Sequence, residues 1–285
     1  MKLDSAVLER HPLPRVVDGD KETKGRILIV AGSRDVPGAA LLAATAAMRA
    51  GAGKLRIATV ESAAMPLAVA MPEAMVLGLA EASDGSFGHG AVERIRDNAS
   101  QVDAVVAGPG VNRSDMCKQM ADALLESGAA LALDVALLET LEPLHDRSLK
   151  RASAPILLPN AKELAALLDC DQDEVGRDPV HSGLRAAELY RSIVLVKGVT
   201  SNVVTPDGEC WTYEGGAPGL GVSGSGDVLA GIVGGLLARG AAPLAALLWS
   251  VWLHGEAGAR LARKVGPIGF LAREIAGEIP ALLPR

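Results

Sequence analysis

Short apolar runs alternate with longer segments rich in alanine and leucine along the first part of the chain. The runs RILIVAGS at 26–33 and KLRIATV at 54–60 carry the β-branched residues that are typical of strands. They are separated by GAALLAATAAMRAGAG at 38–53 and followed by SAAMPLAVAM at 62–71, which have the length and composition of helices. Strands that alternate with helices of ten or more residues predict βαβ units and a mostly parallel sheet.

This alternation continues toward residue 200 and then changes. Further apolar strands, covered on both faces, are expected at 103–107, 130–135, 156–158 and 193–197. The segment SNVVTPDGECWTY alternates around Asp207-Gly208, which predicts an antiparallel hairpin. Three helices are expected after it, around 227–239, 243–264 and 269–277.

Together these elements predict an α/β fold with a central, mostly parallel sheet, helices on both of its faces and a short antiparallel edge. Because no linker or internal repeat interrupts the pattern, we expect residues 1–285 to form a single domain, with 1–24 as an N-terminal extension. The methionines near 65–75 are expected in the core. Trp249 and Trp252 lie three residues apart and are expected on one packed helix face.

Composition and charge exclude several classes of protein. The formal net charge is -6 and no dense run of Lys or Arg occurs, so nucleic acid is not an expected partner. Three widely spaced cysteines, Cys117, Cys170 and Cys210, indicate neither a disulfide framework nor a metal site. The N-terminus has no signal-peptide pattern, and the most apolar run, at 241–253, is shorter than the roughly 20 residues of a membrane span. We therefore expect a cytoplasmic protein that does not enter membranes.

Glycine-rich loops follow most of the predicted strands. Ligands of open α/β sheets bind beyond the carboxyl ends of the strands, so these loops are candidate binding segments. Glycine there lets backbone amides approach a phosphate more closely than a side chain would allow. The loops are 31–33 with 37–39, 108–110, 159–163, 197–201 and 223–227.

The last of these loops, within GVSGSGDVLAGIVGG at 221–235, gives the sharpest indication of chemistry. Gly224 and Gly226 leave the amides at a helix N-terminus uncovered, where the helix dipole favours an anion by roughly 0.3–1 kcal/mol. Asp227 would stand beside that anion and could take a proton from a hydroxyl that attacks a phosphoryl group. Asp is also a common cap near helix N-termini, and Gly231, Gly234 and Gly235 could simply permit close helix packing. The spacing alone does not decide whether Asp227 is a catalytic base or a helix cap.

Other signatures of nucleotide and metal sites are missing from the sequence. No GxxxxGK[ST] motif occurs, and the segment 224–229 lacks the final small residue of the dinucleotide fingerprint. His254 lies on a predicted helix and is expected to be a packed or capping residue. The remaining histidines are His11, His89, His145 and His181. They are not spaced as metal ligands are, so no zinc site is predicted.

Sequence blocks in a recognisable order span nearly the whole chain, from about Lys24 to the segment GPIGFLAREI. They are KGRILIVAGS, PGAALLAATAAMRAGAGKLRIAT, PEAM at 72–75, GPG, LDVALL, PNAKEL, VLVKGVTS, GSGDVLAGIVGGLLARG and WLHGEAG. Their order resembles the ADP-dependent (S)-NAD(P)H-hydrate dehydratase family of the ribokinase-like superfamily. GSGD alone marks only the superfamily, whereas the order of all the blocks is more specific. The resemblance implies a ribokinase-like fold.

It also implies roles for individual residues. Asp227 matches the catalytic acid/base aspartate that meets the substrate, and Ser225 and Gly226 match the anion hole for the nucleotide phosphate. Ala39 and Gly110 match positions that line the hydrated nicotinamide. The loop that touches AMP or ADP would comprise Lys197, Gly198, Val199, Thr200 and Ser201, with Thr200 and Ser201 where the family usually has Gly and Thr.

One loop departs from the family. Asn160 stands where a substrate-facing His is usual, and Lys162 where Gly is usual. The PN-x-x-E pattern is closer to sugar and vitamin kinases of the superfamily, in which Asn and Glu help to order magnesium and phosphate. Asn can form hydrogen bonds but cannot shuttle a proton near neutral pH. Glu163 is a candidate water-mediated magnesium ligand, or else an exposed glutamate in a first helical turn.

The resemblance implies a lyase that repairs hydrated NADH or NADPH (NADHX or NADPHX) with ADP as co-substrate and magnesium, giving AMP and phosphate. Transfer of the terminal phosphoryl group of ADP to the ring hydroxyl would turn a poor leaving group into phosphate. Two alternatives stay open: an ATP-dependent kinase of a small hydroxymethyl compound, such as a pyrimidine or thiazole alcohol, and a nucleotide-binding pseudoenzyme. The resemblance also implies a homo-oligomer, namely a tetramer.

Overall fold

The computed structural model describes residues 1–15, 24–144 and 153–284, and within these ranges nine strands form one sheet. The strands are β1 (Arg26–Val30), β2 (Lys54–Val60), β3 (Ala74–Leu79), β4 (Ala104–Ala107), β5 (Ala130–Leu133), β6 (Ile156–Leu157), β7 (Ile193–Val196), β8 (Ser201–Val204) and β9 (Cys210–Tyr213). Their order is β3-β2-β1-β4-β5-β6-β7-β8-β9. Strands β1 to β7 pair in parallel, and β8 and β9 pair antiparallel at one end. The predicted α/β fold with an antiparallel edge is confirmed.

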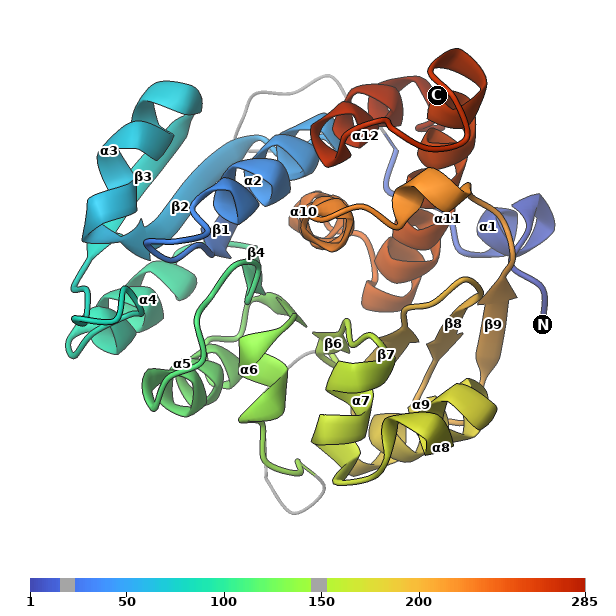
Figure 1. Ribbon diagram of the computed structural model, residues 1–285, viewed down its shortest axis with the longest axis horizontal. Helices are drawn as coiled ribbons and strands as arrows, with labels where there is room; N and C mark the ends of the chain where they lie inside the picture. Colours follow the sequence, from blue (N-terminus) through green and yellow to red (C-terminus); the bar gives the residue numbers. More distant parts are fainter. Residues whose placement is uncertain (16–23, 145–152, 285) are drawn as a thin grey trace.

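Helices cover both faces of this sheet (Figure 1). They are α1 (Ser5–Arg10), α2 (Gly38–Arg49), α3 (Glu61–Ala70), α4 (Ala91–Ala99), α5 (Met116–Leu125), α6 (Ala136–Glu139), α7 (Ala161–Leu168), α8 (Gln172–Arg177), α9 (Pro179–Leu189), α10 (Ser225–Ala238), α11 (Pro243–Lys264) and α12 (Ala272–Glu278). Helices α2, α10, α11 and α12 lie on one side of the sheet, and α4, α5, α7, α8 and α9 on the other. The last three helices fall where the sequence predicts helices. No helix in the described ranges is long and apolar enough for a bilayer crossing.

The free edge at β3 corrects one prediction from the sequence. Met65 of α3 is 73% exposed and Met75 of β3 is 55% exposed, so these two methionines are not core residues, although Met71 is buried. The reason is topological: β3 is the terminal strand, so it and α3 have neighbours on one side only. The packed tryptophan pair is confirmed, with ring centroids of Trp249 and Trp252 5.7 Å apart.

At the opposite edge, the first residues of the chain pair with β9. The amide of Leu3 donates to the carbonyl oxygen of Thr212 at 2.8 Å, and the amide of Thr212 donates to the carbonyl oxygen of Met1 at 2.8 Å. The described part of the predicted N-terminal extension therefore covers the edge strand, which would otherwise present unpaired amides. The rest of the extension, 16–23, lies outside the described residues, as does His145.

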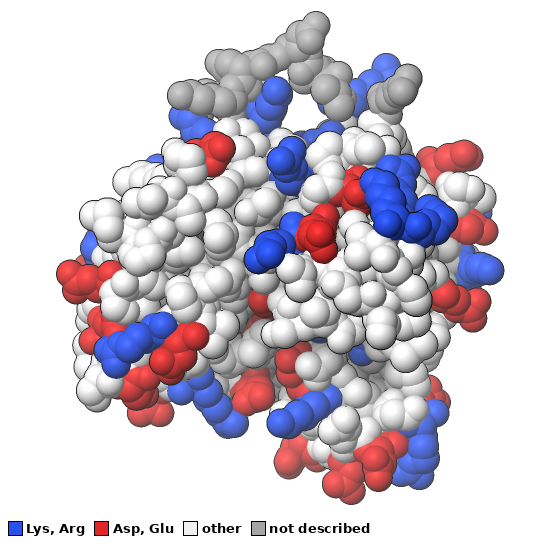
Figure 2. Space-filling model, turned by 45° about the horizontal axis from the view of Figure 1, so that its top comes forward, with Lys and Arg blue, Asp and Glu red and all other residues white. Residues whose placement is uncertain are grey.

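Figure 2 shows acidic and basic side chains interspersed over the face in view.

Helix α10 packs unusually close to α2 because glycines face it. A methyl group on Gly231 would collide with the carbonyl oxygen of Ala43, and one on Gly235 would lie 2.5 Å from the carbonyl oxygen of Ala47. On the sheet side, a methyl group on Gly234 would collide with Val106. These three glycines therefore have the packing role that the sequence left open. The close contact between α10 and α2 sets the position of the N-terminus of α10.

We expect Gly231→Ala to destabilise the protein by about 1–3 kcal/mol, because the added methyl group overpacks the α10–α2 contact. The free energy of unfolding, measured by urea titration, checks this. Gly277→Ala is the matched control, since Gly277 is also helical but has no atom within 4 Å of its would-be Cβ. That substitution should be neutral or stabilise by about 0.5–1 kcal/mol. Equal effects at both positions would contradict the packing argument.

Candidate functional site

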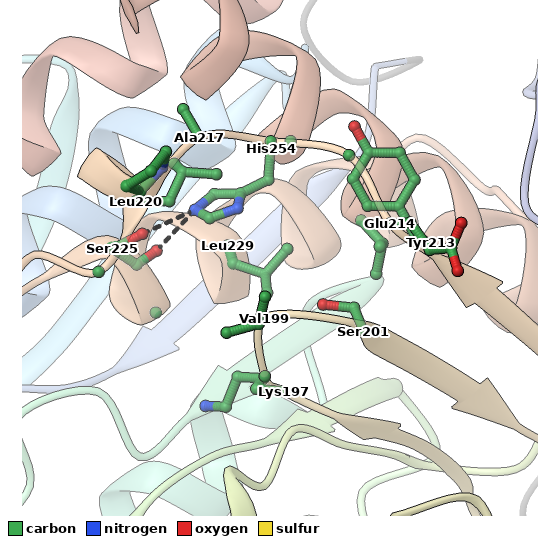
Figure 3. Close-up of a pocket in the computed structure, with 18 of the residues that line it drawn as sticks. Lys197, Val199, Ser201, Tyr213, Glu214, Ala217, Leu220, Ser225, Leu229 and His254 are labelled. Atoms are coloured by element: carbon green, nitrogen blue, oxygen red, sulfur yellow. Dashed lines mark hydrogen bonds between the residues drawn. The ribbon is translucent and has the colours of Figure 1, made fainter. Parts of the chain in front are cut away.

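A cavity of about 780 Å³ opens at the carboxyl ends of β6 and β7 (Figure 3). Its wall comes from the loops after these strands, from the segment between β9 and α10, and from the facing sides of α10 and α11. The side chains labelled in Figure 3 are Lys197, Val199, Ser201, Tyr213, Glu214, Ala217, Leu220, Ser225, Leu229 and His254. This is the position at which open α/β sheets bind ligands.

Lys197, which lines this cavity, is held by two carboxylates. Its Nζ atom lies 2.7 Å from Oδ1 of Asp134 and 3.8 Å from Oε2 of Glu163, and all three side chains are largely buried. Burial alone would lower the pKa of Lys197, but the charges of Asp134 and Glu163 outweigh it and the pKa is raised. The lysine is therefore a fixed positive charge at the end of the sheet.

Asp134, which does not itself line the cavity but holds Lys197, was not among the candidates from the sequence. Asp134 directly follows β5. A carboxylate at the end of an apolar strand is the sequence feature that could have marked it as a candidate. The next residue, Val135, has φ 46°, a left-handed conformation that is strained for a β-branched residue. A methyl group on Gly108 would collide with the carbonyl oxygen of Asp134, so this glycine allows the two strand ends to meet. Asp134 is thus held by an unusually constrained backbone.

Asp227 is the third residue of α10, and its carboxyl group is not a helix cap. The N-cap is Gly224 with φ 88°, and among the described residues no side chain caps α10. The structure therefore favours the alternative that Asp227 has another task. Burial, with a further contribution from Asp134, raises the pKa of Asp227 to about 6, and Lys197 opposes this rise. A carboxyl group with this pKa is suited to accept a proton near neutral pH.

Ser225 and Gly226 place the N-terminus of α10 at the cavity. Both line it, and a methyl group on Gly226 would meet only Nζ of Lys197, at 3.8 Å. In contrast to Gly231, Gly226 is therefore small without any packing need within the protein. Its lack of a side chain leaves open space between the helix terminus and a fixed positive charge, which is the environment of an anion site.

Asn160 and Glu163 form a capping box at the start of α7. The side chain of Asn160 accepts a hydrogen bond from the amide of Glu163 at 2.9 Å, and Glu163 accepts one from the amide of Asn160 at 2.9 Å. Asn160 also lines the cavity. Glu163 is mostly buried, so the alternative of an exposed glutamate is wrong, and burial is the main cause that raises its pKa.

The remaining residues predicted for the site divide into two groups. Gly198, Val199 and Ser201 line the cavity, whereas the adjacent Thr200 is exposed outside its lining. Ala39 and Gly110 lie against each other, since a methyl group on Gly110 would approach Cβ of Ala39 to 2.5 Å. Neither of these two lines the cavity, and Ala39 is buried. The structure thus brings the nucleotide residues together and places Ala39 and Gly110 as a separate pair.

The block WLHGEAG contributes more to the cavity wall than the sequence analysis predicted. His254 contacts Ser225, and Gly255 leaves room for the ring of Tyr213. The hydroxyl of Tyr213 donates to Oε1 of Glu256 at 3.1 Å. This one turn of α11 therefore fixes the first turn of α10 and the end of β9. The reading of His254 as a packed residue holds, but the residue also faces the cavity.

Comparison with known proteins gives the family. Residues 27–281 match the family model described as NAD(P)H-hydrate dehydratase. The chain belongs to this family. The resemblance carried by the order of the sequence blocks is confirmed, and with it the prediction that the protein is an enzyme of the hydro-lyase class.

Individual relatives support the same assignment. The chain is 45% identical over 284 residues to the ADP-dependent (S)-NAD(P)H-hydrate dehydratase of Xanthomonas campestris, covering 99% of this chain and 95% of the relative. It is 32% identical to a bifunctional NAD(P)H-hydrate repair enzyme of Moorella thermoacetica, of which it spans about half, 54%. Among solved structures, the ADP/ATP-dependent NAD(P)H-hydrate dehydratase of Bacillus subtilis, co-crystallised with ATP and Mg²⁺, superimposes with a TM-score of 0.85 at 27% identity, covering 99% of this chain and 96% of that one.

Proposed function

We propose that this family member catalyses the ADP-dependent dehydration of the S epimer of hydrated NADH or NADPH, giving NAD(P)H, AMP and phosphate. The proposal rests above all on Asp227, a half-buried carboxyl group whose pKa is raised to about 6, at the glycine-rich N-terminus of α10 and under the influence of the Lys197 charge. The 45% identity to the Xanthomonas enzyme over nearly the whole chain supports the same reaction.

In the proposed reaction Asp227 takes the proton of the ring hydroxyl as its oxygen attacks the terminal phosphoryl group of ADP, and AMP leaves. The ring nitrogen then expels phosphate, and transfer of a proton from the neighbouring carbon to water restores the double bond. The amides of Ser225 and Gly226 would stabilise the charge on the transferring group, and Lys197 would add its fixed charge. The loop Lys197 to Ser201 would hold the nucleotide, and Ala39, Gly110 and Asn160 the nicotinamide.

The residues around Lys197 fit a magnesium ion that arrives with the nucleotide. Asp134 and Glu163 offer carboxylate oxygens, the ligand type that Mg²⁺ prefers. The described residues contain no group of three or more His, Cys, Asp and Glu side chains that could hold a metal, so the phosphates would supply further ligands. Glu163 would contact the ion through water. When bound, the ion balances the negative charge of the phosphates.

The proposed reaction is tested by incubating the purified protein with hydrated NADPH and Mg²⁺, adding ADP or ATP in parallel. We expect the absorbance of reduced nicotinamide to return with ADP, together with equal amounts of AMP and phosphate. The sequence PNAKE at 159–163, which is closer to the sugar and vitamin kinases of the superfamily, favours a second candidate, an ATP-dependent kinase of a small hydroxymethyl compound. Phosphorylation of such an alcohol, without dehydration of the hydrate, would favour the kinase. ADP binding without any turnover would indicate a pseudoenzyme.

The pH dependence should report the raised pKa of Asp227. The base must be ionised to act, so kcat/KM should fall about tenfold per pH unit below the pKa of about 6 and level off above it. Release of AMP between pH 5 and 8 gives the profile. Glu163→Gln should leave this acidic limb in place, because Glu163 is not the proposed base. A flat profile in the wild-type enzyme would contradict the assignment.

Assembly and compartment stay predictions: we propose a homotetramer in the cytoplasm. Exposed apolar side chains near the β3 edge, at Met65, Val69 and Met75, support burial of this surface against another copy. Light scattering on the purified protein should give a mass four times that of the chain, and a monomer would refute the assembly.

A further inference from the structure

The imidazole of His254 faces two oxygen atoms of one residue at the N-terminus of α10 (Figure 3). Its Nε2 atom lies 3.0 Å from the hydroxyl oxygen of Ser225 and 3.1 Å from the carbonyl oxygen of Ser225. A carbonyl oxygen can only accept a hydrogen bond, so the nitrogen that faces it must carry a proton. The geometry therefore selects the tautomer with the proton on Nε2.

This tautomer decides what the serine hydroxyl can do. Since the Nε2 proton points toward both oxygens, the hydroxyl oxygen of Ser225 is an acceptor from His254, and its own proton is directed elsewhere. Ser225 lines the cavity at the first residue of α10, next to Gly226. Burial, and to a smaller extent Lys197, lowers the pKa of His254 to about 4, so the ring is neutral at physiological pH. The residue thus contributes orientation rather than charge.

We propose that His254 is a positioning residue that holds the Ser225 hydroxyl as a hydrogen-bond donor to a nucleotide phosphate in the cavity. The inference rests on the proposed function for the nature of the ligand. It assigns a task to the histidine of the WLHGEAG block. Together with the backbone amides of the first turn of α10, the hydroxyl would complete the set of donors around the phosphate.

The test is a double-mutant cycle on ADP binding, measured by calorimetry with Mg²⁺ and without hydrated nicotinamide. We expect Ser225→Ala and His254→Leu each to weaken ADP binding roughly tenfold to a hundredfold, the range for a hydrogen bond to a charged group. The double variant should be no weaker than either single variant, because both remove the same hydrogen bond. His254→Gln, whose amide can donate from a similar position, should restore most of the affinity.

Two controls separate positioning from a loss of structure. Ser250→Ala removes a different buried hydroxyl, on α11, which bonds within its own helix and does not line the cavity, and should leave ADP binding unchanged. Nitrogen NMR of the labelled wild-type protein should show the Nε2-protonated tautomer of His254, whether or not the Leu variant folds. An Nδ1-protonated ring, multiplied effects in the double variant, or unchanged binding in His254→Leu would overturn the proposal. Because no hydrated nicotinamide is present, these results are independent of whether dehydration occurs.

Discussion

Asp227→Asn is expected to lower kcat by a factor of about 10² to 10⁴, the usual contribution of a positioned acid or base. The amide has nearly the shape of the carboxyl group but cannot accept the hydroxyl proton. ADP affinity should change little, because the helix amides and Lys197 that hold the phosphate stay in place. Rates of AMP release at saturating ADP and hydrated NADPH give kcat, and calorimetry gives the affinity.

The same variant should not lose stability. The folded-state pKa of Asp227 is raised from 3.8 to about 6, so at neutral pH the ionised carboxylate is disfavoured by folding. Removing this charge should leave Tm at pH 7 unchanged or higher. Asp173→Asn is the matched control, since Asp173 also lies in a first helical turn but is exposed and on another helix, α8. Wild-type turnover in Asp227→Asn would refute its role as the base.

Gly226→Val should weaken ADP binding by a factor of roughly 100, because its side chain would occupy the space proposed for the phosphate and cost at least one charge-assisted hydrogen bond. The fold should survive, since Nζ of Lys197, at the ordinary contact distance of 3.8 Å, is the nearest atom to the would-be Cβ. Gly226→Ala should have a smaller effect in the same direction. Calorimetric titration with ADP measures both variants.

The expected pattern at Gly226 is the reverse of that at Gly231. A side chain at Gly226 should weaken ADP binding while the free energy of unfolding is preserved. A side chain at Gly231 should mainly lower the free energy of unfolding. Unchanged ADP affinity in a folded Gly226→Val protein would show that the phosphate lies elsewhere.

Most strands, and the three helices at the end of the chain, could be predicted from the sequence because apolar runs and their spacing are local features. The packing role of Gly231 was one of the alternatives that the sequence offered, because small residues one turn apart are typical of a helix contact, and the structure decided in its favour. Partners distant in the sequence could not be read in this way. Lys197 and Asp134 are 63 residues apart, and Ser225 and His254 are 29 apart, and no periodicity specifies which side chains meet across a sheet edge or between two helices.

The misplacement of Met65 and Met75 has a similar cause. Their apolar character is visible in the sequence, but their exposure follows from the terminal position of β3, which depends on the strand order of the whole sheet. The strand β3 itself was not predicted, since Pro72 and Gly78 interrupt the apolar pattern around it. For the candidate site, the sequence pointed to Asp227 and its glycines as candidates, while the setting that raises the pKa of Asp227 emerged only from the fold.

Transfer of the phosphoryl group to the ring hydroxyl is tested most directly by following the oxygen atom of that hydroxyl. Hydrated NADPH prepared in ¹⁸O-water carries the label on the ring, and turnover with ADP is then run in ordinary water. The proposed reaction predicts that each released phosphate contains one labelled oxygen, detectable by mass spectrometry or phosphorus NMR. Unlabelled phosphate, with the label released into water, would contradict the mechanism even if NADPH were restored.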